Sequence, residues 1–238
     1  MIAVEGLAVD YGPVRAVRDL SFEIRDGEVL AILGRNGAGK TTTMKALAGL
    51  LPAAEGRMSD GDVDITRAGA DERVSRGIVL VPEGRGMFAD LSVRENLLMG
   101  AYARRKSSRA LREDLDRVTA PFPRLRERMA QRSGSLSGGE QQMLAVARGL
   151  MAEPKVLMID EPSLGLAPVI VDQLYEFLGS IRDQGMTLVI VEQYVRVALG
   201  IADRAYVLDK GEIALEGDAA TLRDSPELID TYLANNAA

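Results

Sequence analysis

Eight consecutive residues have the types and spacing of a phosphate-binding loop. The pattern G-x-x-x-x-G-K-[ST] is filled by Gly34, Arg35, Asn36, Gly37, Ala38, Gly39, Lys40 and Thr41, and Thr42 follows it. A short apolar run, 28–33, precedes this loop, and a segment with helical spacing, 42–50, follows it. A strand that leads through a glycine-rich turn into a helix aims backbone N–H groups and a lysine ammonium at one point, where a polyphosphate is held. We therefore predict a nucleoside triphosphate site, against the alternative of an ordinary glycine-rich turn.

Two carboxylates end a second apolar run, Val156-Leu-Met-Ile-Asp160-Glu161. Phosphoryl transfer from a nucleoside triphosphate needs Mg²⁺ and a positioned water. We expect the Thr41 hydroxyl and Asp160 to hold the metal and Glu161 to reach the water. The alternative is a strand that simply ends in solvated acids.

A third motif, Ser137-Gly138-Gly139-Glu140, has the form of a capped helix start. Ser137 is a favourable N-cap, and Glu140 stands three residues later, as in a capping box. The motif is either purely structural or a second anion site at a helix N-terminus. A chain with two such sites can enclose a nucleotide between two copies of itself.

The elements around these motifs predict an α/β protein. Residues 1–25 alternate apolar and polar side chains around a turn at 10–13, which predicts a small antiparallel sheet. Strand-like runs occur at 29–33, 77–81, 155–160, 187–191, 205–208 and 212–216. In the second half of the chain these runs alternate with helical segments at 139–151, 169–182 and 195–201. This order predicts a parallel sheet with helices on both faces. Residues 92–132 have helical spacing and mixed charges, which predicts an inserted helical subdomain, and the tail 218–233 is expected to be helical.

Composition excludes several kinds of chemistry. The 238 residues include neither His nor Cys, so imidazole catalysis, His-ligated metals, thiolate metal sites and disulfides are all absent. The net charge of −6 argues against a nucleic-acid binder, and no apolar run is long enough to span a bilayer. Asp60-Gly-Asp-Val-Asp64 opens like a calcium loop, but Ile65 stands where that loop needs glycine, so we interpret it as a polar turn.

A phosphate loop, then Leu-Ser-Gly-Gly-Glu, then an apolar run ending in Asp-Glu resembles the ATP-binding subunit of ABC transporters. The resemblance extends over essentially the whole chain. It implies an α/β P-loop NTPase core with an N-terminal antiparallel β subdomain and an inserted α-helical subdomain. It also implies one domain over 1–238, with 1–84 and 151–238 in the ATPase core and about 85–150 in the helical subdomain.

The same resemblance assigns roles to the motifs. It implies a head-to-tail dimer in which ATP and Mg²⁺ lie between the loop 34–42 of one subunit and Ser137, Gly138 and Gly139 of the other. Tyr11 matches the aromatic residue that stacks on adenine, although without the resemblance it is only a turn tyrosine. Glu161 matches the general base. Lys40 and Gln193 then act at the γ-phosphate.

At three positions the chain departs from the common pattern of ABC ATP-binding subunits, and these departures indicate a subfamily. Glu83 stands where most members carry Gln, Gly165 where they carry Asp, and Gln193 where they carry the switch His. Together with Glu-Gln-Gln-Met at 140–143, they resemble the ATP-binding proteins of branched-chain amino acid uptake, and urea and amide importers share much of this pattern. Gln193 donates an amide N–H but carries no positive charge. Glu83 is either a further metal ligand or a turn residue.

Partners and location follow from the family and not from the motifs alone. The resemblance implies permease subunits in the membrane, a second ATP-binding subunit in a homodimer or heterodimer, an indirect role for an extracytoplasmic solute-binding protein, and no nucleic acid. The chain is then peripheral, at the cytoplasmic face of the inner membrane. Met87 and Phe88 are either a docking floor for the permease or core residues. The alternative functions are a soluble ABC ATPase outside transport and an ATP-binding clamp without turnover.

Overall fold

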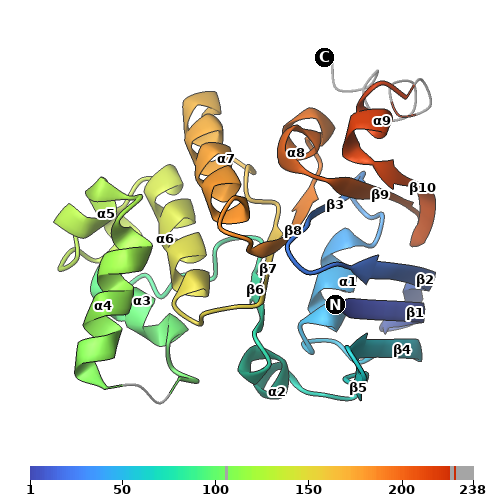
Figure 1. Cartoon of the computed structure of the whole chain (residues 1–238), viewed down its shortest axis with the longest axis horizontal. Helices are drawn as coiled ribbons and strands as arrows, with labels where there is room; N and C mark the ends of the chain where they lie inside the picture. The colour runs from blue at the N-terminus through green and yellow to red at the C-terminus, as the bar shows by residue number, and fades with distance from the viewer. Residues whose placement is uncertain (105–106, 226–227, 229–238) are drawn as a thin grey trace.

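The computed structural model describes residues 1–104, 107–225 and 228. In this part of the chain two β-sheets lie on one side of the molecule and helices α3 to α6 on the other (Figure 1). Helices α7 and α8 lie between and above them in the same view. The predicted α/β class is confirmed.

The larger sheet has the order β10-β9-β3-β8-β7-β6. Its strands are β3 (Val29–Gly34), β6 (Ile78–Val81), β7 (Val156–Asp160), β8 (Thr187–Glu192), β9 (Arg204–Asp209) and β10 (Glu212–Asp218). All neighbouring pairs are parallel except β9 and β10. The strands β3, β7 and β8 are buried along their whole length, as expected for strands covered on both faces.

The smaller sheet is antiparallel, in the order β2-β1-β4-β5. It contains β1 (Ile2–Tyr11), β2 (Val14–Ile24), β4 (Glu55–Asp60) and β5 (Val63–Asp64). The hairpin of β1 and β2 is the one that the alternation predicts. The turn at 61–62 joins β4 to β5.

Helices follow the predicted order, with one addition. The helices are α1 (Lys40–Leu47), α2 (Ala70–Ser75), α3 (Val93–Gly100), α4 (Ser108–Thr119), α5 (Pro123–Glu127), α6 (Gly138–Leu150), α7 (Pro168–Arg182), α8 (Val195–Ile201) and α9 (Ala219–Arg223), and one 3₁₀ turn spans Ser133–Ser135. Helix α2 was not predicted. Of the tail predicted to be helical over 218–233, α9 forms only Ala219–Arg223, and residues 224–225 lie outside the helix. Residues 226–227 and 229–233 lie outside the described residues. None of the described helices is both long and apolar enough to cross a membrane.

The large sheet separates two layers of core. One of its faces packs on α1 and the antiparallel sheet, through Leu30, Ile32 and Met158. The other packs on α6 and α7, through Leu157 and Ile159, and on α8 and α9 nearer the β9 edge. Because β3 and β7 run parallel to β8, the loop before α1 and the turn after β7 project from the same carboxyl edge of the sheet. Ligands bind at this edge in folds of this kind.

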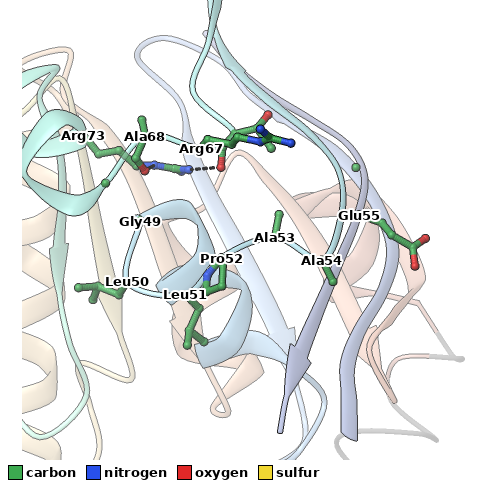
Figure 2. A pocket seen from close by; sticks show the side chains of 13 residues that line it. Gly49, Leu50, Leu51, Pro52, Ala53, Ala54, Glu55, Arg67, Ala68 and Arg73 are labelled. Carbon is green, nitrogen blue, oxygen red and sulfur yellow. Dashed lines mark hydrogen bonds between the residues drawn. The ribbon is translucent and has the colours of Figure 1, made fainter. Parts of the chain in front are cut away.

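A buried arginine fixes the far end of α1. The Arg73 guanidinium, 1% exposed, donates to Leu47 O at 2.7 Å, at the last turn of α1, and to Ile65 O at 2.7 Å. It borders a cavity of about 380 Å³ (Figure 2) lined from 49 to 56 and from 66 to 69. Burial lowers the pKa of Arg73. The bonds of Arg73 therefore anchor the end of α1. No residue of the phosphate loop lines the cavity, so the cavity is not the predicted nucleotide site.

Candidate active site

The phosphate loop has the backbone that its glycines predict. Gly37 and Gly39 have φ of 83° and 98°, in the left-handed region that side chains disfavour. A Cβ at Gly34 would lie 2.5 Å from Leu208 O of the neighbouring strand. Gly39 is the N-cap of α1 and offers no side-chain cap, so the helix begins with N–H groups available to an anion.

Lys40 lies inside the loop that it belongs to. Its side chain is 4% exposed, and its Nζ donates to Gly34 O at 2.9 Å and to Arg35 O at 3.3 Å. The same Nζ is 3.2 Å from Oε1 of Glu161. Helix α1 and the end of β7 therefore bring the predicted phosphate-binding lysine and the predicted base into direct contact.

Asp160 has an unsatisfied carboxylate. The residue is 2% exposed, and its Oδ1 is buried without a hydrogen-bond partner. Burial raises its pKa to about 6, the Thr41 hydroxyl and the Lys40 ammonium lower it, and the charges of Glu161 and Glu83 raise it. An orphaned carboxylate oxygen in a residue that also bonds the Thr41 hydroxyl is of the hard-oxygen type that Mg²⁺ prefers, and the charges of Glu161 and Glu83 act on it from nearby.

Glu161 has an unusual backbone. Its φ is 48°, which is uncommon for a residue other than glycine, and its N–H donates to Val191 O at 2.9 Å. The turn after β7 is thus attached to the end of β8. The side chain, 9% exposed, is directed to Lys40.

The remaining predicted residues are more exposed. Glu83 is exposed in the turn after β6, close enough for its charge to affect Asp160. Gln193 is half-buried directly after β8, and its N–H donates to the Glu192 carboxylate. Tyr11, the last residue of β1, is 62% exposed.

The motif at 137–140 forms the start of α6. The Ser137 Oγ accepts from the Glu140 N–H, and the Glu140 carboxylate accepts from the Ser137 N–H at 2.9 Å. Burial alone would raise the pKa of Glu140, but the bonds from Ser137 and the charge of Arg128 lower it overall. A Cβ at Gly139 would lie 2.6 Å from Ile170, so α7 approaches α6 closely at this glycine.

The two helix starts lie in different parts of the molecule. Helix α6 lies with α3 to α5, whereas α1 lies among the sheets (Figure 1). A cavity of about 760 Å³ beside Ser137 and Gly139 is lined from α5, α6 and α7 and from no residue of the phosphate loop. The cavity beside the Ser-Gly-Gly motif is therefore separate from the phosphate loop of the same chain.

One connection between these parts was missed from the sequence. Arg85, at φ 69°, donates to the Gln141 Oε1 at 2.9 Å, which ties the turn containing Glu83 to the first turn of α6. Arg148 of α6 donates to the carbonyls of Arg85 and Gly86. The available signal was a run of charged and glycine residues, 83–86, directly after a buried strand.

The comparisons with known proteins agree with this geometry. The family model described as ABC transporter matches residues 17–164, more than half of the chain. The chain belongs to the ABC transporter family. The match starts in β2 and includes the phosphate loop, the start of α6 and the end of β7, so the predicted family and its P-loop ATPase fold are confirmed.

Relatives of the family match the whole chain. A high-affinity branched-chain amino acid transport ATP-binding protein, BraG of Pseudomonas aeruginosa, is 42% identical and is aligned over 98% of this chain and 99% of its own length. A lipopolysaccharide export system ATP-binding protein, LptB of Escherichia coli, is 33% identical over 98% of this chain and 96% of its own.

A solved structure of an ABC ATP-binding cassette has the same fold. The ADP conformation of MJ1267, an ATP-binding cassette of an ABC transporter, superposes with a TM-score of 0.85 at 26% identity, covering 98% of each chain. The chain is accordingly a nucleotide-binding ABC ATPase, as predicted. The roles of individual residues remain predictions.

Proposed function

We propose that this chain hydrolyses ATP to drive import of a branched-chain or chemically related amino acid through separate permease subunits. The observation that carries the hydrolytic part is the contact of Lys40 with Glu161 beside the orphaned oxygen of Asp160. The identity to BraG supports the choice of solute. Urea or amide import and an ATPase outside transport are the alternatives.

The contact between Lys40 and Glu161 implies a change when ATP enters. The Lys40 ammonium is shared among two loop carbonyls and the Glu161 carboxylate. An ATP phosphate competes for this ammonium, since the loop N–H groups direct it there. Glu161 then loses its cation and is free to accept a proton from the attacking water, while the Gln193 amide donates to the γ-phosphate.

Mg²⁺ is the metal that the donor set suits. Thr41 and Asp160 would hold it, with Glu83 as a further carboxylate nearby, and Mg²⁺ when bound neutralises phosphate charge. Asp160 contributes a pre-placed oxygen that no protein donor uses. This chain's part is therefore to bring hydroxyl and carboxylate oxygens together at the end of the loop.

The active unit proposed is a dimer arranged head to tail. The phosphate loop and the Ser137–Gly139 motif are held apart within one chain, so a second subunit supplies the motif that covers bound ATP, and Tyr11 covers the adenine. The second subunit is a copy of this chain or a sister ATPase. We assign 1–84 and 151–238 to the core and about 85–150 to the helical part that meets the permease.

The proposed location is the cytoplasmic face of the inner membrane, where the chain is held by its permease. An extracytoplasmic binding protein then delivers the solute to that permease, without touching this chain. Of the two residues considered for docking, Met87 packs against the core, whereas Phe88 is 47% exposed. Phe88 and the 85% exposed Tyr102, before and after α3, are the apolar side chains that we propose the permease contacts.

A single substitution tests the chemistry. Glu161→Gln keeps the size of the side chain and removes the base, so we expect ATP binding near the parent value and turnover lower by about a hundredfold or more. Titration calorimetry with ATP measures binding, and phosphate release from the chain with its permease measures turnover. Near-parent turnover in Glu161→Gln would overturn the assignment of the base.

A transport assay tests the solute. Cells with the parent chain should accumulate labelled leucine, and cells with Glu161→Gln should not. If Glu161→Gln leaves leucine uptake unchanged but abolishes urea or amide uptake, the chain serves the alternative importer. If Glu161→Gln changes none of these uptakes, the chain is an ATPase outside transport.

A further inference from the structure

A second buried carboxylate lies directly behind the site. Glu192 is the last residue of β8 and is 1% exposed. Its Oε1 accepts from the Ser163 N–H at 3.0 Å and from the Tyr175 hydroxyl at 2.9 Å. Its Oε2 accepts from the Gln193 N–H at 3.2 Å.

These bonds connect the two segments that carry the predicted catalytic groups. Ser163 follows Glu161 by two residues in the turn after β7, and Gln193 follows β8. The Glu161 N–H also bonds Val191 O, so the turn is attached to the end of β8 at two successive residues. Glu192 is thus the side chain that fixes the base segment against the Gln193 segment.

All three bonds use Glu192 as an acceptor. In the described structure its hydrogen-bond partners are two backbone N–H groups and one hydroxyl, and it forms no ion pair. A buried carboxylate without a cation is costly, and charge-assisted bonds from three donors offset that cost. Burial, followed by the charge of Glu192, raises the pKa of Tyr175 well above its usual value, so Tyr175 stays a donor.

We infer that Glu192 is a positioning residue for ATP hydrolysis: its carboxylate holds Glu161 and Gln193 in register at the γ-phosphate. This inference rests on the proposed roles of those two residues. Glutamine at 192 has almost the same shape, but it replaces one acceptor oxygen by an N–H₂ donor. In either amide orientation, one of the two segments then meets a donor where it needs an acceptor.

The test compares Glu192→Gln and Tyr175→Phe with a matched control. We expect Glu192→Gln to lower kcat about tenfold or more, because small misplacements of catalytic groups have large effects, and to leave the Kd for ATP within about twofold. Tyr175→Phe should lower kcat less, since it removes one of the three bonds. The control is Glu28→Gln, another buried carboxylate, which pairs with Arg204 just before β3, and it should keep the parent kcat.

All measurements use the full chain with its permease. Titration calorimetry with ATP gives Kd, the rate of phosphate release gives kcat, and thermal unfolding verifies the fold of each variant. Parent kcat in both Glu192→Gln and Tyr175→Phe overturns the inference. So does a fall in kcat that is matched by Glu28→Gln, or one accompanied by an equal loss of ATP affinity. Turnover that survives in Glu161→Gln overturns the proposed base instead, whatever the Glu192 variants show.

Discussion

The buried carboxylate of Asp160 lowers the stability of the folded chain when it is ionised. Its carboxylate is buried with one oxygen unsatisfied, and its pKa is raised from 3.8 to about 6. A carboxyl group whose pKa is raised by folding stabilises the folded state only while it is protonated, and this stabilisation is lost as pH rises through the folded pKa. At pH 8 without ligand, the charge of Asp160 therefore opposes folding.

The first prediction follows from this sign. Asp160→Asn should raise the free energy of unfolding at pH 8 by about 1–3 kcal/mol, since one pKa unit corresponds to about 1.4 kcal/mol. The gain should shrink as pH falls below 6 and vanish near pH 3, below the unfolded-state value of 3.8, where Asp160 is protonated in both states. Urea unfolding of the nucleotide-free and Mg²⁺-free chain at these pH values measures it. An Asn variant that is less stable at pH 8 would show that the carboxylate has a partner.

Much of the residue-level site was predictable because its motifs are contiguous. The loop 34–42, the Asp160-Glu161 pair and the cap at Ser137 each depend on local spacing, and each lies on the element expected for it. Glu192 and Arg85 were not predicted as linking residues. Their partners are 29 and 56 residues away, and no local pattern indicates such a contact.

At the scale of elements, the phosphate loop depends on a close approach of two strands. Gly34 ends β3 beside β9, where a Cβ would lie 2.5 Å from Leu208 O. Gly37, three residues later, has positive φ but no atom within 4 Å of a Cβ. Gly34 therefore combines a positive φ of 154° with a steric clash, whereas Gly37 has the positive φ alone.

The second prediction uses this pair. Gly34→Ala must displace backbone and should lower the free energy of unfolding by about 3 kcal/mol or more, whereas Gly37→Ala should lower it by about 1 kcal/mol. Chemical unfolding of both variants without nucleotide gives the comparison. Equal losses would show that strand packing is not what requires glycine at 34.

Elements formed by distant pairing were harder to predict. The central strands and α6 to α8 have clear periodicity, and their predictions were confirmed. Strands β4 and β5 come from a polar, glycine-containing stretch with mostly exposed side chains, and they form because β1 offers a free edge. Helix α2, six residues long, has one buried side chain, Arg73, so its sequence carries no apolar face.

At the scale of the whole molecule, the fold divides one function between two places. The start of α1 holds the groups that we propose bind and hydrolyse ATP, and the start of α6 presents a second set of N–H groups elsewhere (Figure 1). The link from Arg85 to Gln141 connects the turn containing Glu83 with the start of α6. We propose that the permease contacts the chain at Phe88, three residues after Arg85, so a movement there would reach the motif at 137–139 through this bond.

The link gives a third prediction. Arg85→Ala removes the bond to Gln141 and leaves the phosphate loop untouched, so ATP affinity of the chain should stay near the parent value. Stimulation of hydrolysis by the permease should fall by about fivefold or more, within the usual range of coupling energies. Phosphate release with and without permease measures the ratio, and an unchanged ratio would exclude this route.

The claim on which the account depends is that one chain carries only half of a working site. The direct test is the ATPase rate per subunit of the purified chain, measured as its concentration is varied, with light scattering to give the fraction of dimer. The account predicts ATP binding at every concentration and a rate per subunit that rises in proportion to the dimer fraction. A constant and readily measurable rate per subunit in samples that scatter as monomers would contradict it, whereas a rate near zero in monomers would indicate that the second subunit is a sister ATPase.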